Sequence, residues 1–145
     1  MTAATDFHWP VRVYYEDTDA GGVVYHANYL KFMERARTEW LRELGFEQDR
    51  LRADCGVVFA VRRASLDMRR PARFNEALEV TCEPRRLRRA SVEFVQVVRR
   101  DGEALVVGEI MIACVDPERG VPAAVPESVH RAMHAAIATD TEATG

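Results

Sequence analysis

The residues from Glu16 to Tyr29, EDTDAGGVVYHANY, combine types that could do chemistry on a carbonyl group. Asp19 supplies a carboxylate that could act as a nucleophile or a general base. Gly21 and Gly22 let the backbone turn sharply and approach a ligand closely. A helix is predicted to begin just after them. Its first N–H groups are unpaired and can hold negative charge that develops on an oxygen. A carboxylate beside such an oxyanion site suits attack on a carbonyl.

The same stretch also has a purely structural interpretation. Asp-rich loops before helices mostly form turns and caps, because Asp and Asn readily bond the local backbone. Spacing alone favours that role for Glu16 and Asp17, and it favours packing or capping for the side chain of His26. The EDTD stretch lacks the later ligands of a calcium loop, so we predict no metal site and no cofactor.

The bulk composition is that of an ordinary globular protein, with 145 residues, 48% of them hydrophobic and 30% charged. We expect one domain over residues 1–145, with flexible tails at 1–7 and 139–145. A net charge of −3 gives no support to nucleic-acid binding. Three widely spaced cysteines without a CxxC pair, and no run that suits a signal peptide or membrane span, predict a cytoplasmic protein with reduced thiols.

The elements that must position the Asp-Gly loop can be read from hydrophobic periodicity. A strand is predicted from Trp9 to Glu16, where Val11, Val13 and Tyr15 alternate with polar or less apolar neighbours. We predict a helix from an N-cap at Asn28 to a stop at Gly45, because apolar residues recur at spacings of three and four. Residues 48–56 are predicted to be a polar connection.

The second half of the chain is predicted to be a run of strands. They cover residues 57–70, 78–84, 91–100 and 103–115, with a hairpin turn at 99–102 and a turn at 85–89. A short helix over 126–138 closes the chain. The order β-α-β-β-β-β, with strands joined by short turns, predicts an α+β fold in which an antiparallel sheet packs on one long helix.

A partner chain is also expected. One helix does not cover a five-stranded sheet alone, and the strand at 103–115 has no clean polar face, as if both sides were buried. We therefore expect a homo-oligomer that pairs sheets edge to edge.

The segment WPVRVYYEDTDAGGVVYHANYLKFMERARTEWL resembles the hotdog-fold acyl-CoA thioesterases of the 4-hydroxybenzoyl-CoA thioesterase group. It is most similar to the branch associated with the Tol-Pal envelope system. The motif D-T-D-x-x-G-x-V-Y-H-x-x-Y followed by E-R-A-R carries the resemblance, which extends over nearly the whole chain. The resemblance implies a hotdog fold, in which an antiparallel sheet wraps one long helix, and active sites at the interfaces of a homodimer or tetramer.

The resemblance also implies a reaction and its residues. The family's catalytic carboxylate is the second Asp of the DTD motif, which is Asp19. A backbone amide at or beside His26, with Tyr25 next to it, polarises the thioester carbonyl. Whether Asp19 attacks the carbonyl or activates water stays open. The expected activity is hydrolysis of an acyl-CoA to a carboxylic acid and CoA.

An arginine-rich stretch suggests where CoA phosphates bind. Residues 57–100 hold eleven arginines against five carboxylates, a net charge of +6. Most of these arginines are expected on solvated strand faces, but a guanidinium fork also fits phosphate. Arg88, Arg89 and Ser91, in or after the predicted turn, are our candidates for binding CoA.

Two other functions fit the same fold. A hotdog dehydratase acting on acyl-carrier-protein thioesters needs a His and an acid facing each other, whereas an Asp in this loop favours hydrolysis. The other alternative is a scaffold with little turnover that binds acyl carrier protein in envelope or lipid metabolism. The acyl group itself cannot be read from the sequence.

Overall fold

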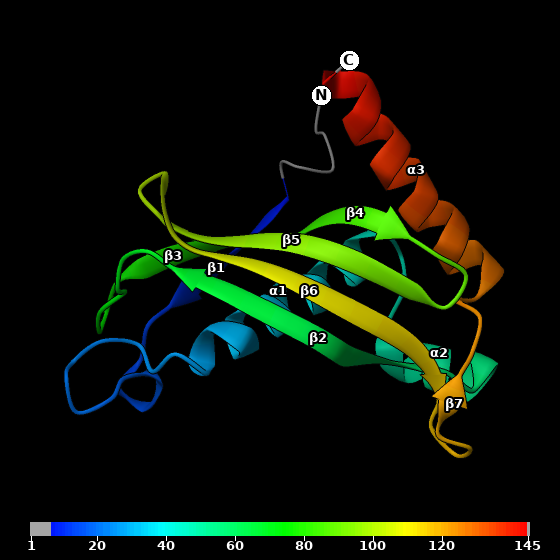
Figure 1. Ribbon diagram of the computed structural model, residues 1–145, viewed down its shortest axis with the longest axis horizontal. Helices are drawn as coiled ribbons and strands as arrows, with labels where there is room; N and C mark the ends of the chain where they lie inside the picture. Colours follow the sequence, from blue (N-terminus) through cyan, green and yellow to red (C-terminus); the bar gives the residue numbers. More distant parts are fainter. Residues whose placement is uncertain (1–6, 145) are drawn as a thin grey trace.

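The computed structural model describes residues 7–144, with side chains described as far as 137. Within this range a seven-stranded antiparallel sheet packs against α1 (Figure 1). The strands are β1 (His8–Arg12), β2 (Val58–Met68), β3 (Ala77–Thr81), β4 (Glu83–Leu87), β5 (Ser91–Arg100), β6 (Glu103–Asp116) and β7 (Val121–Pro122). The helices are α1 (Asn28–Glu43), α2 (Gln48–Cys55) and α3 (Glu127–Thr144), with a short 3₁₀ turn, η2 (Tyr15–Asp17).

The sheet follows the order β1-β3-β5-β6-β2, with β4 paired to β5 and β7 paired to β6. The predicted hairpin between β5 and β6 is present, and its turn places Asp101 and Gly102 at positive φ. The α+β class expected from the sequence is confirmed. No helix in residues 7–144 is both long and apolar enough to cross a membrane.

The core forms where the apolar stripe of α1 meets the inner face of the sheet. Phe32, Met33, Ala36 and Trp40 recur at helical spacing and are all buried. The Trp40 ring meets Phe94 of β5 edge to face, with centroids 5.4 Å apart. Contacts of this kind favour burial of the whole stripe, so the stripe determines which face of α1 packs on the sheet.

One buried amide also ties α1 to the sheet. Gln96 of β5 is fully buried, and its Nε2 donates to the carbonyl oxygens of Met33 (2.9 Å) and Thr81 (3.1 Å). A buried polar group without hydrogen-bond partners destabilises the folded state. These bonds therefore fix the position of α1 on the sheet more precisely than apolar packing does.

Several predicted elements need correction. The first strand ends at Arg12 instead of Glu16, because the Tyr14 N–H bonds the carboxylate of Asp17 and the chain turns into η2. Residues 48–55, predicted to be a polar connection, form a helix instead. Leu51 is its one buried side chain, so the sequence there shows almost no apolar periodicity. The helix α3 runs to Thr144, past the predicted end at residue 138. The predicted tail at 1–7 lies, apart from Phe7, outside the described residues.

The strands β4 and β6 also differ from expectation. Arg85 and Arg86 lie in β4, opposite β5, so the turn is confined to residues 88–90. The apolar strand β6 is flanked by β5 and β2 inside one chain, and this position accounts for its burial without a partner chain. The path of the sheet ends at β1 and at β2, each of which pairs with one neighbour only, and β2 is the longer of these two edge strands.

Close packing under α1 generates a test of the fold. A Cβ added at Gly108 of β6 would lie 2.7 Å from Sδ and Cε of Met33 and 3.2 Å from Cδ2 of Leu66. Since Met33 is fully buried, Gly108→Val is expected to lower the free energy of unfolding by about 1–3 kcal/mol. Urea denaturation measures this change.

The control is the same substitution in a Met33→Ala background, where the shortened side chain leaves room for the new methyl groups. Gly108→Val should then cost clearly less than it does alone. Equal costs in the two backgrounds would show that the contact between Gly108 and Met33 does not limit packing there.

Candidate active site

The carboxylate of Asp17 joins the Asp-Gly loop to the start of α1. Asp17 is only 5% exposed; its Oδ2 accepts from the Tyr14 N–H (2.8 Å) and its Oδ1 from Nδ2 of Asn28 (2.9 Å). Its backbone oxygen accepts from the Tyr25 N–H (2.8 Å). The structural interpretation of Asp17 is therefore confirmed, but Asn28 is the first residue of α1 and not its N-cap. Its side chain turns back to Asp17 instead of capping the helix.

Asp19 sits at the tip of a small hairpin. An isolated bridge joins Thr18 to Val24, and the Asp19 N–H donates to the Val23 oxygen (2.9 Å). The Gly21 N–H donates to Asp19 Oδ1 (2.8 Å), which orients the carboxylate. Gly22 takes a φ of +81°, a conformation that favours glycine. Asp19 is exposed, and its Oδ2 has no hydrogen-bond partner among residues 7–137.

The start of α1 offers free donors beside this hairpin. Neither the His26 N–H nor the Ala27 N–H reaches an acceptor within the described part of the chain. The His26 ring leans on Tyr25, with centroids 4.5 Å apart, and both side chains are exposed. Unpaired amides at a helix start carry partial positive charge, so they can stabilise negative charge on an oxygen.

Residues 70–76, which we call the brace loop, hold the hairpin from the other side. The Val24 N–H donates to the Ala72 oxygen (2.8 Å), and an isolated bridge joins Val23 to Arg73. The Ala72 N–H in turn donates to the hydroxyl of Tyr29, a buried residue in the first turn of α1 (3.1 Å). The hairpin is thus fixed to α1 twice, through Asp17 and through the brace loop.

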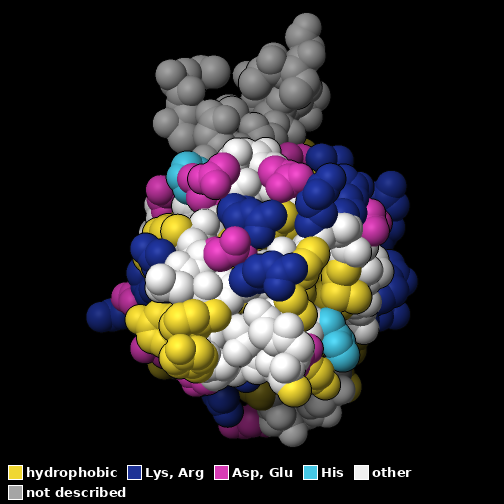
Figure 2. Space-filling view, turned by 90° about the vertical axis from the view of Figure 1, so that its left-hand side faces the viewer, with side chains coloured by type: hydrophobic (Ala, Val, Ile, Leu, Met, Phe, Trp, Pro, Cys, Tyr) yellow, Lys and Arg dark blue, Asp and Glu magenta, His cyan; other side chains and the backbone are white. Residues whose placement is uncertain are grey.

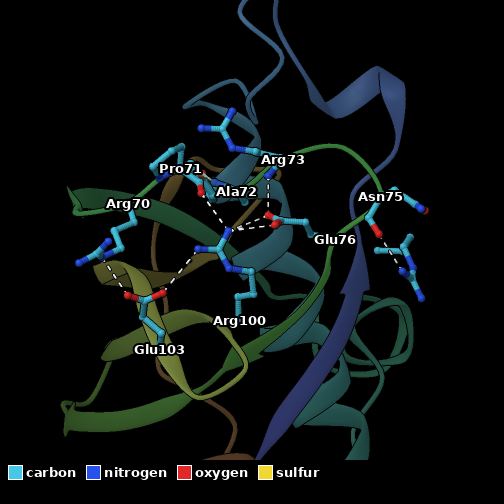
Figure 3. Close-up of polar contacts among 10 residues, drawn as sticks. Arg70, Pro71, Ala72, Arg73, Asn75, Glu76, Arg100 and Glu103 are labelled. Carbon is cyan, nitrogen blue, oxygen red and sulfur yellow. Dashed lines mark hydrogen bonds and ion pairs between the residues drawn. The ribbon is translucent and has the colours of Figure 1, made fainter.

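Arg100 holds the brace loop itself (Figure 3). From the end of β5, its Nη1 donates to both carboxylate oxygens of Glu76 (2.9 and 3.0 Å) and to the Pro71 oxygen (3.3 Å). Glu103 lies 3.5 Å from its Nη2 and also pairs with Arg70. The hydrogen bond to Glu76 and the nearby carboxylates raise the pKa of Arg100, so it stays charged.

Aromatic side chains surround this end of the molecule. Tyr15 is 76% exposed and stacks on Phe74 of the brace loop, with centroids 3.8 Å apart. Tyr14 and Tyr25 are exposed nearby in the chain. Figure 2 looks onto the end of the molecule that Figure 1 shows at the left, where apolar, basic and acidic side chains are interspersed. The hairpin thus lies at an open surface and not in a closed pocket.

The residues proposed for CoA binding lie elsewhere. The turn with Arg88 and Arg89 is at the α3 end of the sheet, whereas the Asp19 hairpin is at the opposite end (Figure 1). Arg88 Nη1 lies 3.3 Å from a Glu93 oxygen, and Ser91 begins β5. One chain therefore brings Asp19, Tyr25 and His26 together but leaves Arg88, Arg89 and Ser91 apart from them.

Most other arginines of the basic stretch have the structural role expected for them. Ion pairs join them to nearby carboxylates: Arg69 with Asp67, Arg70 with Glu103, Arg85 with Glu83, Arg99 with Glu79 and Arg100 with Glu76. Among the side chains of residues 7–137, no group of three or more His, Cys, Asp or Glu is placed to hold a metal ion.

Comparisons with known proteins place this arrangement in a family. The profile of the thioesterase-like superfamily matches residues 13–133, a range that includes the hairpin, the helix start and the whole sheet except β1. The chain belongs to the thioesterase-like superfamily. The hotdog fold and the family expected from the DTD motif are thereby confirmed.

Individual relatives agree with this assignment. The chain is 48% identical over 126 residues to the acyl-CoA thioester hydrolase YbgC of Escherichia coli O6:H1, covering 86% of this chain and 93% of that protein. It is 44% identical over 128 residues to the acyl-CoA thioesterase YbgC of Haemophilus influenzae, covering 88% and 94%. The crystal structure of a probable thioesterase from Bartonella henselae is 35% identical and superposes with a TM-score of 0.78 over 83% of this chain and 98% of that one.

Sequence reasoning missed the parts that support the hairpin. The stretch Arg99-Arg100-Asp101-Gly102 signalled only a turn, and Glu76 gave no signal because its partner is 24 residues away. The helical spacing places Tyr29 in the apolar stripe of α1, and this pattern hides the role of its hydroxyl. Long-range polar pairs of this kind leave no local pattern, so only the folded chain reveals them.

This support predicts that Arg100 controls the order of the hairpin. Arg100→Met should loosen the brace loop, so the Val24 amide, which bonds the Ala72 oxygen, should exchange with solvent faster. Amide hydrogen exchange followed by NMR measures this directly, without a substrate.

Arg70→Met is the matched control, because the one ion pair that the Arg70 side chain makes in the described chain is with Glu103 at the surface. Exchange at Val24 should stay near the wild-type rate in that variant. Equal rates in Arg100→Met and Arg70→Met would contradict the bracing role.

Proposed function

We propose that this protein hydrolyses acyl-CoA thioesters to a carboxylic acid and CoA. The observation that carries the proposal is the free N–H of His26 at the start of α1, next in the chain to the hairpin that presents Asp19. A thioester carbonyl needs both parts: a donor for the developing oxyanion and an oxygen that attacks the carbon. The YbgC relatives, named as acyl-CoA thioester hydrolases and thioesterases, support the same reaction.

The reaction has two possible routes at Asp19. In one, Oδ2 bonds to the thioester carbon, the carbon–sulfur bond breaks, the CoA thiolate leaves and takes up a proton, and water hydrolyses the resulting anhydride. In the other, Asp19 removes a proton from a water molecule that attacks the carbon directly. In both, the free His26 N–H holds the carbonyl oxygen, whereas the Tyr25 N–H is already engaged by the Asp17 oxygen. Oriented by the Gly21 amide through Oδ1, Asp19 keeps Oδ2 free for either role.

A second copy of the chain would complete the site. Asp19, Tyr25 and His26 are all exposed, whereas electrostatic stabilisation of an oxyanion is strongest where water is excluded. The strand β2 has one free edge, and residues 60–65 are exposed on both of its faces. A long free edge of this kind is a template for pairing with another strand. We infer that two copies pair through β2.

Twofold pairing would also bring Arg88 and Arg89 toward the site of the other copy. The register places Ser91 and Ala60 opposite the same residue of β6, Ala113, so the Arg88–Arg89 turn lies at the Val58 end of β2. The brace loop and the hairpin follow the Met68 end. In an antiparallel pair of β2 strands, the Val58 end of one copy lies beside the Met68 end of the other. Arg88, Arg89 and Ser91 of one copy would then face the CoA bound at the other copy's Asp19.

The proposed function predicts the effect of Asp19→Asn, a nearly isosteric change that removes the charge. Loss of the attacking or proton-accepting oxygen is expected to lower kcat about 10²–10⁴-fold while the melting temperature stays close to wild type. Thiol release from a panel of acyl-CoAs, from acetyl to palmitoyl plus 4-hydroxybenzoyl, measures the rates with a thiol-reactive dye.

Glu16→Gln is the control, because Glu16 is exposed in the same loop and makes no hydrogen bond in the described chain. It should keep most of the activity. If wild type and Asp19→Asn are equally slow on every acyl-CoA, hydrolysis at Asp19 is excluded. Pulldown of acyl carrier protein would then test the scaffold alternative.

Pairing through β2 predicts different outcomes for prolines at two adjacent residues, Ala64 and Ser65. Successive N–H groups of a strand point to opposite edges, so one proline removes a bond to β6 and the other removes an N–H at the free edge. The wild type is expected to be a dimer or tetramer by light scattering after size exclusion. One proline variant should stay folded and become monomeric. A monomeric wild type would refute pairing.

A further inference from the structure

A cavity of about 240 Å³ lies between α1, α2 and the inner face of the sheet, away from the hairpin of the same chain. Val61, 54% exposed, lies at its rim on the free edge of β2. Apolar side chains from α1, α3 and the sheet form most of its wall: Leu41, Phe59, Val92, Phe94, Ile112 and Met133. The polar groups at the wall come mainly from one face of α1, where Glu34, Arg37 and Thr38 lie.

Arg37 is the unusual group in this wall. It is 8% exposed, yet no carboxylate in the described chain lies within ion-pair distance of it. Its one side-chain hydrogen bond there runs from Nη1 to Gln96 Oε1 (3.0 Å). A guanidinium has five N–H donors, so most of the donors of Arg37 are left for whatever fills the cavity.

The surroundings of Arg37 hold it in place without neutralising it. Gln96 is fixed by its bonds to the Met33 and Thr81 oxygens, so Oε1 is presented to Arg37. Burial lowers the pKa of Arg37 and raises that of the Cys82 thiol, which therefore stays uncharged. The charge of Glu34 on the same helix face raises the pKa of Arg37 against the effect of burial, but Glu34 is exposed and forms no ion pair with Arg37 in the described chain.

A buried charge without a counter-charge destabilises a fold, and a carboxylate is the group that an arginine fork pairs with best. We propose that this cavity takes the far end of the acyl group, and that Arg37 selects acyl chains that end in a carboxylate. The substrate class is then the CoA thioester of a dicarboxylic acid. This inference rests on the proposed thioester hydrolysis.

Twofold pairing through β2 supports the placement. Phe59, Ala60 and Val61 of the cavity wall lie at the Val58 end of β2, the end that faces the Asp19 hairpin of the other copy in that arrangement. A chain whose thioester sits at one copy's Asp19 would thus enter the other copy's cavity past Val61. The same pairing explains why the cavity lies away from the hairpin of its own chain.

Matched substrates test the proposal on the wild-type protein. Hexanoyl-CoA and adipoyl-CoA have equal chain length and differ only in the terminal carboxylate; octanoyl with suberoyl, and decanoyl with sebacoyl, extend the series. For the length that reaches Arg37, we expect kcat/KM for the dicarboxylic member to exceed that of its partner by roughly tenfold or more. A preference for the plain acyl chain at every length would overturn the proposal.

Variants assign the preference to Arg37. Arg37→Met removes the charge and keeps an apolar stem, so the preference should vanish and kcat/KM should become similar for the two members of each substrate pair. Arg42→Met is the control on the same helix, because Arg42 is exposed and pairs with Glu39 and Glu47. If Arg37→Met retains the preference, another group recognises the carboxylate and the proposal fails.

A binding measurement separates this proposal from the proposed function. Adipate, suberate and sebacate should raise the melting temperature of wild type more than the matching monocarboxylates do, and Arg37→Met should abolish the difference. If no acyl-CoA is hydrolysed but this difference in melting temperature is present, the proposed hydrolysis is wrong and the carboxylate site at Arg37 is supported. If plain acyl-CoAs are hydrolysed and no difference is found at any length, the carboxylate site is wrong and the proposed hydrolysis is supported.

Discussion

The candidate site depends on the hydrogen bonds of the buried residue Asp17. Its two carboxylate oxygens accept from the Tyr14 N–H and the Asn28 side chain, and its backbone oxygen accepts from the Tyr25 N–H. These bonds join the end of the first strand to the start of α1 across a gap of eleven residues. A carboxylate that accepts hydrogen bonds is strongly held when it is buried, because losing one partner leaves charge unsatisfied. The buried Asp17 therefore fixes the position of the exposed Asp19.

One buried side-chain amide, that of Gln96, sets the position of α1 on the sheet. It therefore also sets the positions of the groups that lie toward the two ends of this helix. Gln96 bonds the Met33 oxygen on the underside of α1, and the same amide presents its oxygen to Arg37 one turn further on. Toward the N-terminus of the helix lie the free His26 and Ala27 amides, the donors of the proposed oxyanion site. Toward the C-terminus it carries the cation at the cavity wall. A shift of α1 along the sheet would move both sites together, so the packing of Met33 against Gly108 constrains both.

The elements that carry strong periodicity could be predicted from the sequence, whereas Asp19 and His26, which the DTD motif marks, stay predicted site residues. The helix at Asn28–Glu43 and the strand at 91–100 follow from spacing, and the strand predicted at 103–115 follows from a long apolar run. The helix at Gln48–Cys55 could not, because a single buried leucine makes no pattern. The Arg100–Glu76 pair could not either, because it joins distant segments. The prediction of Asn28 as an N-cap is wrong, because an asparagine that caps a helix and one that donates to a distant residue leave the same local sequence pattern.

The placement of charge supports the proposal that one chain holds half of each site. Asp19 and the His26 amide lie at one end of β2, and Arg88, Arg89 and the cavity with Arg37 lie toward the other. In the proposed dimer, a twofold axis through the free edge of β2 would reverse one copy against the other and bring each set opposite its complement. The same axis would pair the exposed residues 60–65 of this long edge, so one symmetry operation would account for both the open strand and the separation of the carboxylate from the cations.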